Sequence, residues 1–383
     1  MALNRTDDNV TARWPSSREE AADAHAAPDQ RTSDFAGGPA TDPKLKLSLN
    51  VVFPLLGGRS TLSHEHLLPI FVSLIVALML MAIPFPGFHL MMHGEPAPPG
   101  VNEAWQVFSI LGIYIAFIIN YYINQMSGRA RSGWLQALVT VITFWLLTTP
   151  FWDYWYDFFY NVIPGQSWEN SSNPFAVIAG DFLGTGLGEE GFKAVPLLGL
   201  ALVSVAFGFW SRRTSGRLSA LLSDIREHFG LREPLDGIVL GAAAGSGFFI
   251  YETLVQYVPQ AIDNAQTNME FQGLVQLLGR GLPELTAHSA YSGLFGYFIG
   301  LSVLRPGMAG LLIPLGWLGA ALLHGAWDAT SDLADSPLIN VPVHVVIGVL
   351  SYALLAGAIF KARDISPSFG RRCVKLRSVE LAT

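Results

Sequence analysis

Three runs of the chain contain no charged residue and are each long enough to cross a bilayer as a helix. They lie at residues 67–84, 105–126 and 133–152. About 20 apolar residues in helical form span the hydrocarbon core of a membrane. Charged residues make up only 14% of the chain, against roughly 25% in an ordinary soluble domain. We therefore predict an all-α protein, a polytopic helical bundle in a lipid bilayer. The sequence does not alternate apolar and polar residues in ten-residue blocks, so an outer-membrane barrel is not favoured.

About eight transmembrane helices are predicted. Segments 85–104 and 153–173 between them contain no Lys or Arg, whereas basic residues gather in the alternate loops and in the tail from Lys361 onward. Arg280 is the one exception. Because basic loops favour the cytosolic side, both termini are expected in the cytosol. The predicted spans are 66–84, 105–126, 133–152, 189–210, 235–258, 282–304, 308–330 and 342–361.

Three regions follow from this pattern: a disordered cytosolic tail at 1–48, a membrane domain at 66–361 and a basic cytosolic tail at 362–383. Residues 1–48 are polar and show no apolar periodicity, which is typical of disorder. The lone Cys373 excludes an intramolecular disulfide. Residues 174–188 are apolar but contain Asp181 and several glycines. Joined to the fourth span they would be too long for one crossing, so we predict an interfacial or re-entrant segment on the outer side.

A set of ionisable side chains lies inside stretches that otherwise read as membrane spans. A charge in hydrocarbon costs at least about 2.5–3.5 kcal/mol on insertion scales, so such residues are rare unless they are paired or functional. Fold stability alone does not require so many of them. The set comprises Glu189, Glu190, Lys193, Glu252, His288, His324 and Asp328.

The predicted spans bring this set to a similar depth, near the outer surface. Glu189 begins the fourth span, Glu252 lies in the outer third of the fifth, and His288 lies about two turns into the sixth. His324 and Asp328 lie in the last two turns of the seventh. Four helices therefore contribute to one predicted site.

Spacing within the motifs supports a single site. His324 and Asp328 are four residues apart and share a helix face. Lys193 lies four residues from Glu189 and three from Glu190, so it can neutralise one carboxylate while the other stays free. A carboxylate pair with two different environments is what a general base near neutral pH needs.

Each residue also has an ordinary explanation. The Glu pair could interact with a helix dipole, Lys193 could extend to the interface, and His288 could be a core histidine bonded to a carbonyl. His324 and Asp328 could form a stabilising interhelical pair. All of these explanations would have to hold independently for the common depth to be a coincidence.

These residues resemble the PrsW family of intramembrane proteases, which is distantly related to the type II CAAX prenyl endopeptidases. The resemblance covers a motif core at roughly 185–330 and includes the stretch 236–252. It implies a bacterial cytoplasmic membrane peptidase that makes the first, extracytoplasmic-side (site-1 type) cut in a single-span membrane protein such as an anti-sigma factor. Thr253 stands where the family commonly has Asn. The motifs are Glu189-Glu190-x-x-Lys193, Phe248-x-x-x-Glu252, His288 and His324-Gly-Ala-Trp327-Asp328.

Two active functions remain open from the residues, beside a non-catalytic scaffold. In a peptidase, Glu189 or Glu190 would activate a water, and His288 and His324 with Glu252 or Asp328 would hold a metal or the oxyanion. Zinc is the candidate metal, with His288, His324 and Glu252 as ligands, although the spacing leaves a metal undecided. In a proton-coupled transporter or channel the same groups would relay protons, but they should then be distributed across the membrane. No basic patch suggests a nucleic acid partner.

Overall fold

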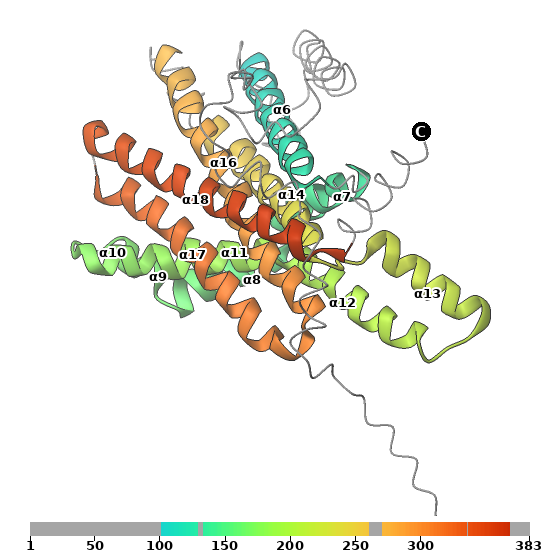
Figure 1. Ribbon diagram of the computed structural model, residues 1–383. Coiled ribbons are helices and arrows are strands. Elements are labelled where there is room, and N and C mark those ends of the chain that lie inside the picture. Colours follow the sequence, from blue (N-terminus) through green and yellow to red (C-terminus); the bar gives the residue numbers. More distant parts are fainter. Residues whose placement is uncertain (1–100, 129–132, 260–269, 335, 368–383) are drawn as a thin grey trace, which may run out of the picture. The chain divides into compact units, whose positions relative to one another are not determined.

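The computed structural model describes residues 101–128, 133–259, 270–334 and 336–367. Every regular element in these ranges is a helix, and all of them belong to one compact unit within residues 60–383. The predicted tail at 1–48, the first predicted span at 66–84 and residues 368–383 of the basic tail lie outside the described residues. Figure 1 shows the arrangement of the helices.

The chain order of the helices is as follows. The first half contains α6 (Val101–Ser127), α7 (Gly133–Leu147), α8 (Pro150–Asp157), η2 (Phe158–Val162), α9 (Gly165–Glu169), α10 (Pro174–Asp181), η3 (Phe182–Glu189) and α11 (Glu190–Lys193). The second half contains α12 (Val195–Ser211), α13 (Gly216–Phe229), α14 (Pro234–Glu252), η4 (Thr253–Tyr257), α16 (Glu270–Leu304), η5 (Pro306–Met308), α17 (Ala309–Leu333) and α18 (Pro337–Ile365).

Helix α14 is the centre of the bundle and packs against α16 at backbone contact. Every residue from Pro234 to Phe249 is buried. A Cβ atom added to Gly237, Gly241 or Gly245 would collide with the α16 backbone at Gly296, Ser292 or His288, respectively. Small residues four apart allow this close approach in membrane helices. The glycine spacing therefore sets the position of His288.

The outer helices expose apolar side chains, as lipid-facing helices do. On α17 and α18, which run side by side in Figure 1, Leu311, Leu322, Val346 and Val349 are each at least 60% exposed. Among the described residues, three helices are long and apolar enough to cross a membrane, or up to five if each bent pair counts as one span. The described part of the chain is thus all-α, with helices long and apolar enough to span a membrane, while the number eight and the orientation of the termini stay predictions.

In the segment before Glu189, at residues 174–188, the helix bends at a different position from the one predicted. Helix continues without interruption from Pro174 through Lys193, and the 40° bend to α12 lies at Ala194 rather than at residue 188. Pro196 explains the position, because a proline is favoured in the first turn of a new helix and disfavoured inside one. The Glu pair therefore lies inside a helical stretch and not at a helix start, which removes the helix-dipole explanation for it.

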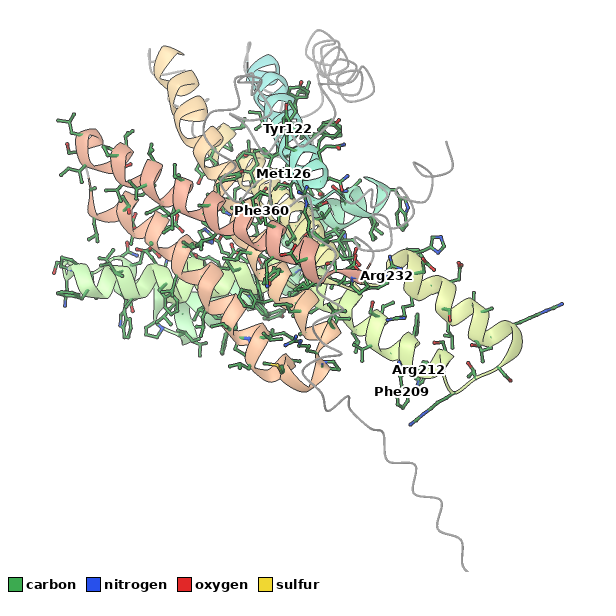
Figure 2. All side chains as sticks on the ribbon, in the orientation of Figure 1. Tyr122, Met126, Phe209, Arg212, Arg232 and Phe360 are labelled. Carbon is green, nitrogen blue, oxygen red and sulfur yellow. The ribbon has the colours of Figure 1, made fainter. Side chains whose placement is uncertain are left out.

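Helices α12 and α13 form a hairpin in the basic region predicted between the fourth and fifth spans. Two hydrogen bonds hold α13 against α12: Arg226 donates from Nε to the Ser204 carbonyl at 3.1 Å, and the Leu231 amide donates to the Leu200 carbonyl. Figure 2 shows Phe209 and Arg212 near the end of α12, and the Arg213 guanidinium lies 3.7 Å from the Phe209 ring centre. Apolar and basic side chains thus meet where the hairpin turns, which is typical of a membrane interface.

Candidate active site

The ionisable residues singled out in the sequence come together from four parts of the fold. Glu189 ends η3, and Glu190 and Lys193 lie on α11. Glu252 ends α14, His288 lies on α16, and both His324 and Asp328 lie on α17. Asp328 has the most exposed side chain of the seven, at 25%, and the other six are exposed by 10% or less. The structure thus joins all seven in one buried cluster.

Glu190 is the fully held member of the Glu pair. Lys193 donates from Nζ to its Oε1 at 2.8 Å, and Ser292 donates from Oγ to its Oε2 at 2.9 Å. Glu190 and Lys193 are each 0% exposed. A buried charge pair of this kind is strongly destabilised when one partner is removed, because the other charge is left uncompensated. This geometry gives Glu190 a fixed orientation and occupies both of its oxygens.

Glu189 is held more loosely. Its Oε2 lies 3.5 Å from the Lys193 Nζ and 3.6 Å from the His324 Nε2, and the residue keeps 8% of its surface exposed. Lys193 is thus nearer to Glu190 than to Glu189 by 0.7 Å (3.5 against 2.8 Å). The two carboxylates thus differ: Glu190 is closely paired with Lys193, whereas Glu189 makes longer contacts.

His288 lies between a cation and a carboxylate. Its Nδ1 lies 2.8 Å from the Lys193 Nζ, and its Nε2 lies 3.0 Å from the Glu252 Oε2. An ammonium group can only donate, so Nδ1 is the accepting nitrogen and the ring's proton belongs on Nε2 when the ring is neutral. Glu252 then orients the ring from the opposite side.

His324 faces the same point from α17. Its Nε2 lies 3.3 Å from the Asp328 Oδ2, and its Nδ1 lies 3.1 Å from the Glu190 Oε1. The two imidazole rings are 4.9 Å apart between centroids and nearly perpendicular. Tyr291, fully buried, stacks on the His324 ring at 5.3 Å. Each histidine is therefore fixed by a carboxylate and by ring packing.

The arrangement can hold a metal ion, with one change from the predicted ligands. One ligand atom each from Glu189, His288 and His324 lie within 4.8 Å of one another, and all three residues are buried. Two imidazole nitrogens and a carboxylate oxygen form a donor set suited to zinc. By this spacing Glu189 takes the place predicted for Glu252, which instead contacts the His288 ring. Lys193 and Glu252 contact both nitrogens of His288, so a metal ion bound to this ring would replace one of these contacts.

The backbone that carries Glu189 is unusual. Residues Phe182–Glu189 form a π-helical stretch, a rare geometry that occurs often at functional sites. Two indole groups satisfy carbonyls there: Trp155 donates from Nε1 to the Gly188 oxygen at 2.7 Å, and Trp317 donates to the Leu187 oxygen at 2.9 Å. A backbone carbonyl in an apolar medium needs such a donor. The tryptophans thus fix the position of the Glu pair.

Sequence reasoning missed two residues of the site, Tyr291 and Ser292. They lie three and four residues after His288 on α16, so the helical period places all three on one face. That spacing was the available signal, but an uncharged Ser or Tyr in an apolar helix does not by itself indicate a functional site. Phe248 is already part of a predicted motif. Its ring centre lies 4.1 Å from the Lys193 Nζ, so the ring shields the cation.

Comparison with known proteins gives one match. The model of a family described as PrsW family intramembrane metalloprotease matches residues 107–355. This range contains every residue of the cluster and begins well before the motif core at 185–330. No curated protein and no solved structure matches the chain.

Proposed function

Because the chain belongs to the PrsW family of intramembrane metalloproteases, we propose that the buried cluster is its active site and that it cuts a single-span membrane protein near the outer surface. The observation that carries this proposal is the unequal Glu pair beside two histidines. Glu190 is bound by Lys193 and Ser292, while Glu189 is buried with longer contacts, 3.5 Å to Lys193 and 3.6 Å to His324.

In the proposed reaction the Glu189 carboxylate accepts a proton from a water molecule, whose oxygen attacks the carbonyl carbon of the scissile peptide bond. The C–N bond then breaks, and the proton passes from Glu189 to the leaving amine nitrogen. The products are a carboxylic acid and an amine, which become a carboxylate and an ammonium group when the acid passes its proton to the amine. A carboxylate near two oriented histidines can perform both proton transfers. Glu190 and Lys193 hold the helix that carries Glu189 in place.

By their spacing Glu189, His288 and His324 would hold a metal ion, for which zinc is the proposed identity. When bound, a zinc ion supplies a Lewis acid that polarises a carbonyl and acidifies a water molecule. Without a metal, Glu252 and Asp328 hold the two imidazoles, since they lie 3.0 and 3.3 Å from the Nε2 atoms of His288 and His324.

The proposed substrate class follows from the predicted topology. The outer loops contain almost no basic residue, and the stretch 153–173 next to the Glu pair is aromatic and acidic. A peptide bond just outside a membrane span is easier to expose than one at mid-bilayer, where freed backbone groups lack partners. We therefore propose an anti-sigma factor or a similar single-span protein, in a bacterial cytoplasmic membrane, cut on the extracytoplasmic side.

The test is cleavage of tagged single-span substrates by the purified protein. Glu189→Gln should reduce cleavage by about 10²- to 10⁴-fold while the protein stays folded, because general acid–base catalysis contributes about that factor. Glu227→Gln on the exposed face of α13 is the matched control and should cleave normally. A chelator should inhibit the wild type. Full activity in Glu189→Gln would rule out the proposed role of this residue.

A further inference from the structure

A second group of acidic side chains lies where α9, α10 and α17 meet. Glu169 ends α9, Asp181 ends α10, and Asp332 lies in the last turn of α17. Each offers a carboxylate oxygen, and the three oxygens all lie within 4.8 Å of one another. We propose that these residues form a Ca²⁺ site, separate from the candidate active site, that stabilises the packing of α9 and α10 on α17.

The buried carboxylate of Asp181 is the observation that points to a ligand. The residue is 1% exposed, and within the described part of the chain neither of its carboxylate oxygens has a hydrogen-bond partner. The Oε2 of Glu169 is likewise buried without one. Among the described residues, no Lys or Arg forms an ion pair with either side chain. A buried carboxylate is costly unless a cation or a donor compensates it.

Two glycines hold Asp181 in this position. A Cβ atom on Gly180 would collide with the backbone nitrogen of Glu169. A Cβ atom on Gly325 would lie 2.7 Å from the Phe182 Cα and 3.1 Å from the Asp181 carbonyl carbon. The chain at Asp181 therefore touches α9 on one side and α17 on the other. The carboxylate cannot turn to water unless these helices separate.

The ligand type favours Ca²⁺. Carboxylate oxygens are hard ligands, and the group contains no His or Cys side chain that would favour zinc. Two oxygens on opposite sides of Ca²⁺ are about 4.6–5.2 Å apart, whereas around Mg²⁺ they are only about 4.0–4.2 Å apart. The three oxygens lie within 4.8 Å of one another, close enough to share one ion. Ca²⁺ accepts a flexible arrangement of oxygen ligands, whereas Mg²⁺ requires near-ideal octahedral geometry. The predicted topology also puts these residues on the outer side, where calcium sites of modest affinity operate.

The carboxylates also repel one another electrostatically. Burial, followed by the negative charges of Asp332 and Asp328, raises the pKa of Glu169 above its usual value. A bound divalent cation would reverse this effect, because it offsets the repulsion among the carboxylates. Repulsion would otherwise push α9 and α10 away from α17.

The proposed site is close to the candidate active site along the chain. Asp328 and Asp332 are one turn apart on α17, and the Asp328 Oδ2 lies 3.3 Å from the His324 Nε2. A cation on Asp332 would therefore support the turn that carries Asp328. The proposal does not depend on the proposed proteolysis, since binding and unfolding can be measured without a substrate.

The test uses the purified full-length protein in detergent. Equilibrium dialysis with ⁴⁵Ca²⁺ should find one site per chain, and tryptophan fluorescence should record an unfolding temperature about 5 °C higher in saturating Ca²⁺ than in EGTA. Asp181→Asn and Asp332→Asn should each lose the bound calcium and the temperature shift. Asp332 is exposed, so its variant should fold even if the buried Asp181 variant does not.

Two controls separate this site from other acidic groups. Asp224→Asn, on the exposed face of α13, should keep the binding and the shift. Glu189→Gln should also keep them, and loss of calcium in that variant would show that the ion belongs to the active-site cluster instead. The proposal is overturned if the wild type binds no calcium, if Asp332→Asn binds it as the wild type does, or if Mg²⁺ binds with equal affinity.

Discussion

At the scale of single residues, the candidate site depends on one buried cation shared by several groups. The Lys193 ammonium contacts Glu190 at 2.8 Å, Glu189 at 3.5 Å and the His288 Nδ1 at 2.8 Å. A 0% exposed lysine with these neighbours has no water to replace them. Its charge therefore organises both the carboxylate pair and the first histidine.

Replacing Lys193 by Met should destabilise the protein by about 3–5 kcal/mol, because Glu190 would remain as an uncompensated buried charge. The double variant Lys193→Met with Glu190→Gln should recover part of this loss, since the charge is removed together with its partner. Urea unfolding of the two single variants and the double variant gives the coupling energy. Additive effects would show that the two side chains do not interact as the structure indicates.

The sequence predicted the residues of the site better than the contacts among them. The intervals 189–193, 190–193 and 324–328 gave the helix faces correctly, because helical periodicity is a local property. It could not reveal that Glu189, rather than Glu252, lies within metal-binding distance of both histidines. That contact depends on how η3 packs against α17, which spacing along one helix does not determine.

At the scale of helices, the approach of α14 to α16 decides whether the site forms. The backbones touch at Gly241 and Ser292, one turn beyond the contact of Gly245 with His288. Any side chain at these glycines must push the helices apart. Because Ser292 donates to Glu190, such a shift would also disturb the carboxylate pair.

Gly241→Ala should therefore cost about 1–3 kcal/mol of stability by overpacking and should reduce cleavage. Gly319→Ala makes the same chemical change on α17, where a Cβ atom would meet nothing within 4 Å. That control should be neutral or gain up to about 1 kcal/mol, because alanine favours a helix over glycine. Thermal unfolding and cleavage of both variants provide the comparison. Equal losses in the two would contradict the close packing of α14 on α16.

The element boundaries show where sequence reasoning ends. Apolar runs gave the positions of α6, α14, α17 and α18, because a membrane span is a composition signal. The continuous helix through Asp181 to Lys193 was predicted to break earlier, at residue 188. Its length and its glycines suggested that break, whereas the bend lies at Ala194, just before Pro196.

At the scale of the whole molecule, the predicted orientation rests on the basic residues of alternate loops. It places Cys373, the only cysteine, in the cytosol and segment 153–173 outside. A membrane-impermeant maleimide should label Cys373 only after cells are permeabilised. In a Cys373→Ser background, Ser172→Cys should be labelled in intact cells. Labelling of Cys373 in intact cells would reverse the predicted topology.

The position of the cut tests the central claim most directly. A tagged single-span substrate is incubated with the wild type and with Glu189→Gln, and the product ends are identified by mass spectrometry. The account predicts one main cut, just outside the span or in its outermost turn, made by the wild type and absent with Glu189→Gln. A cut on the cytosolic side of the span, or the same cut made by the variant, would contradict it.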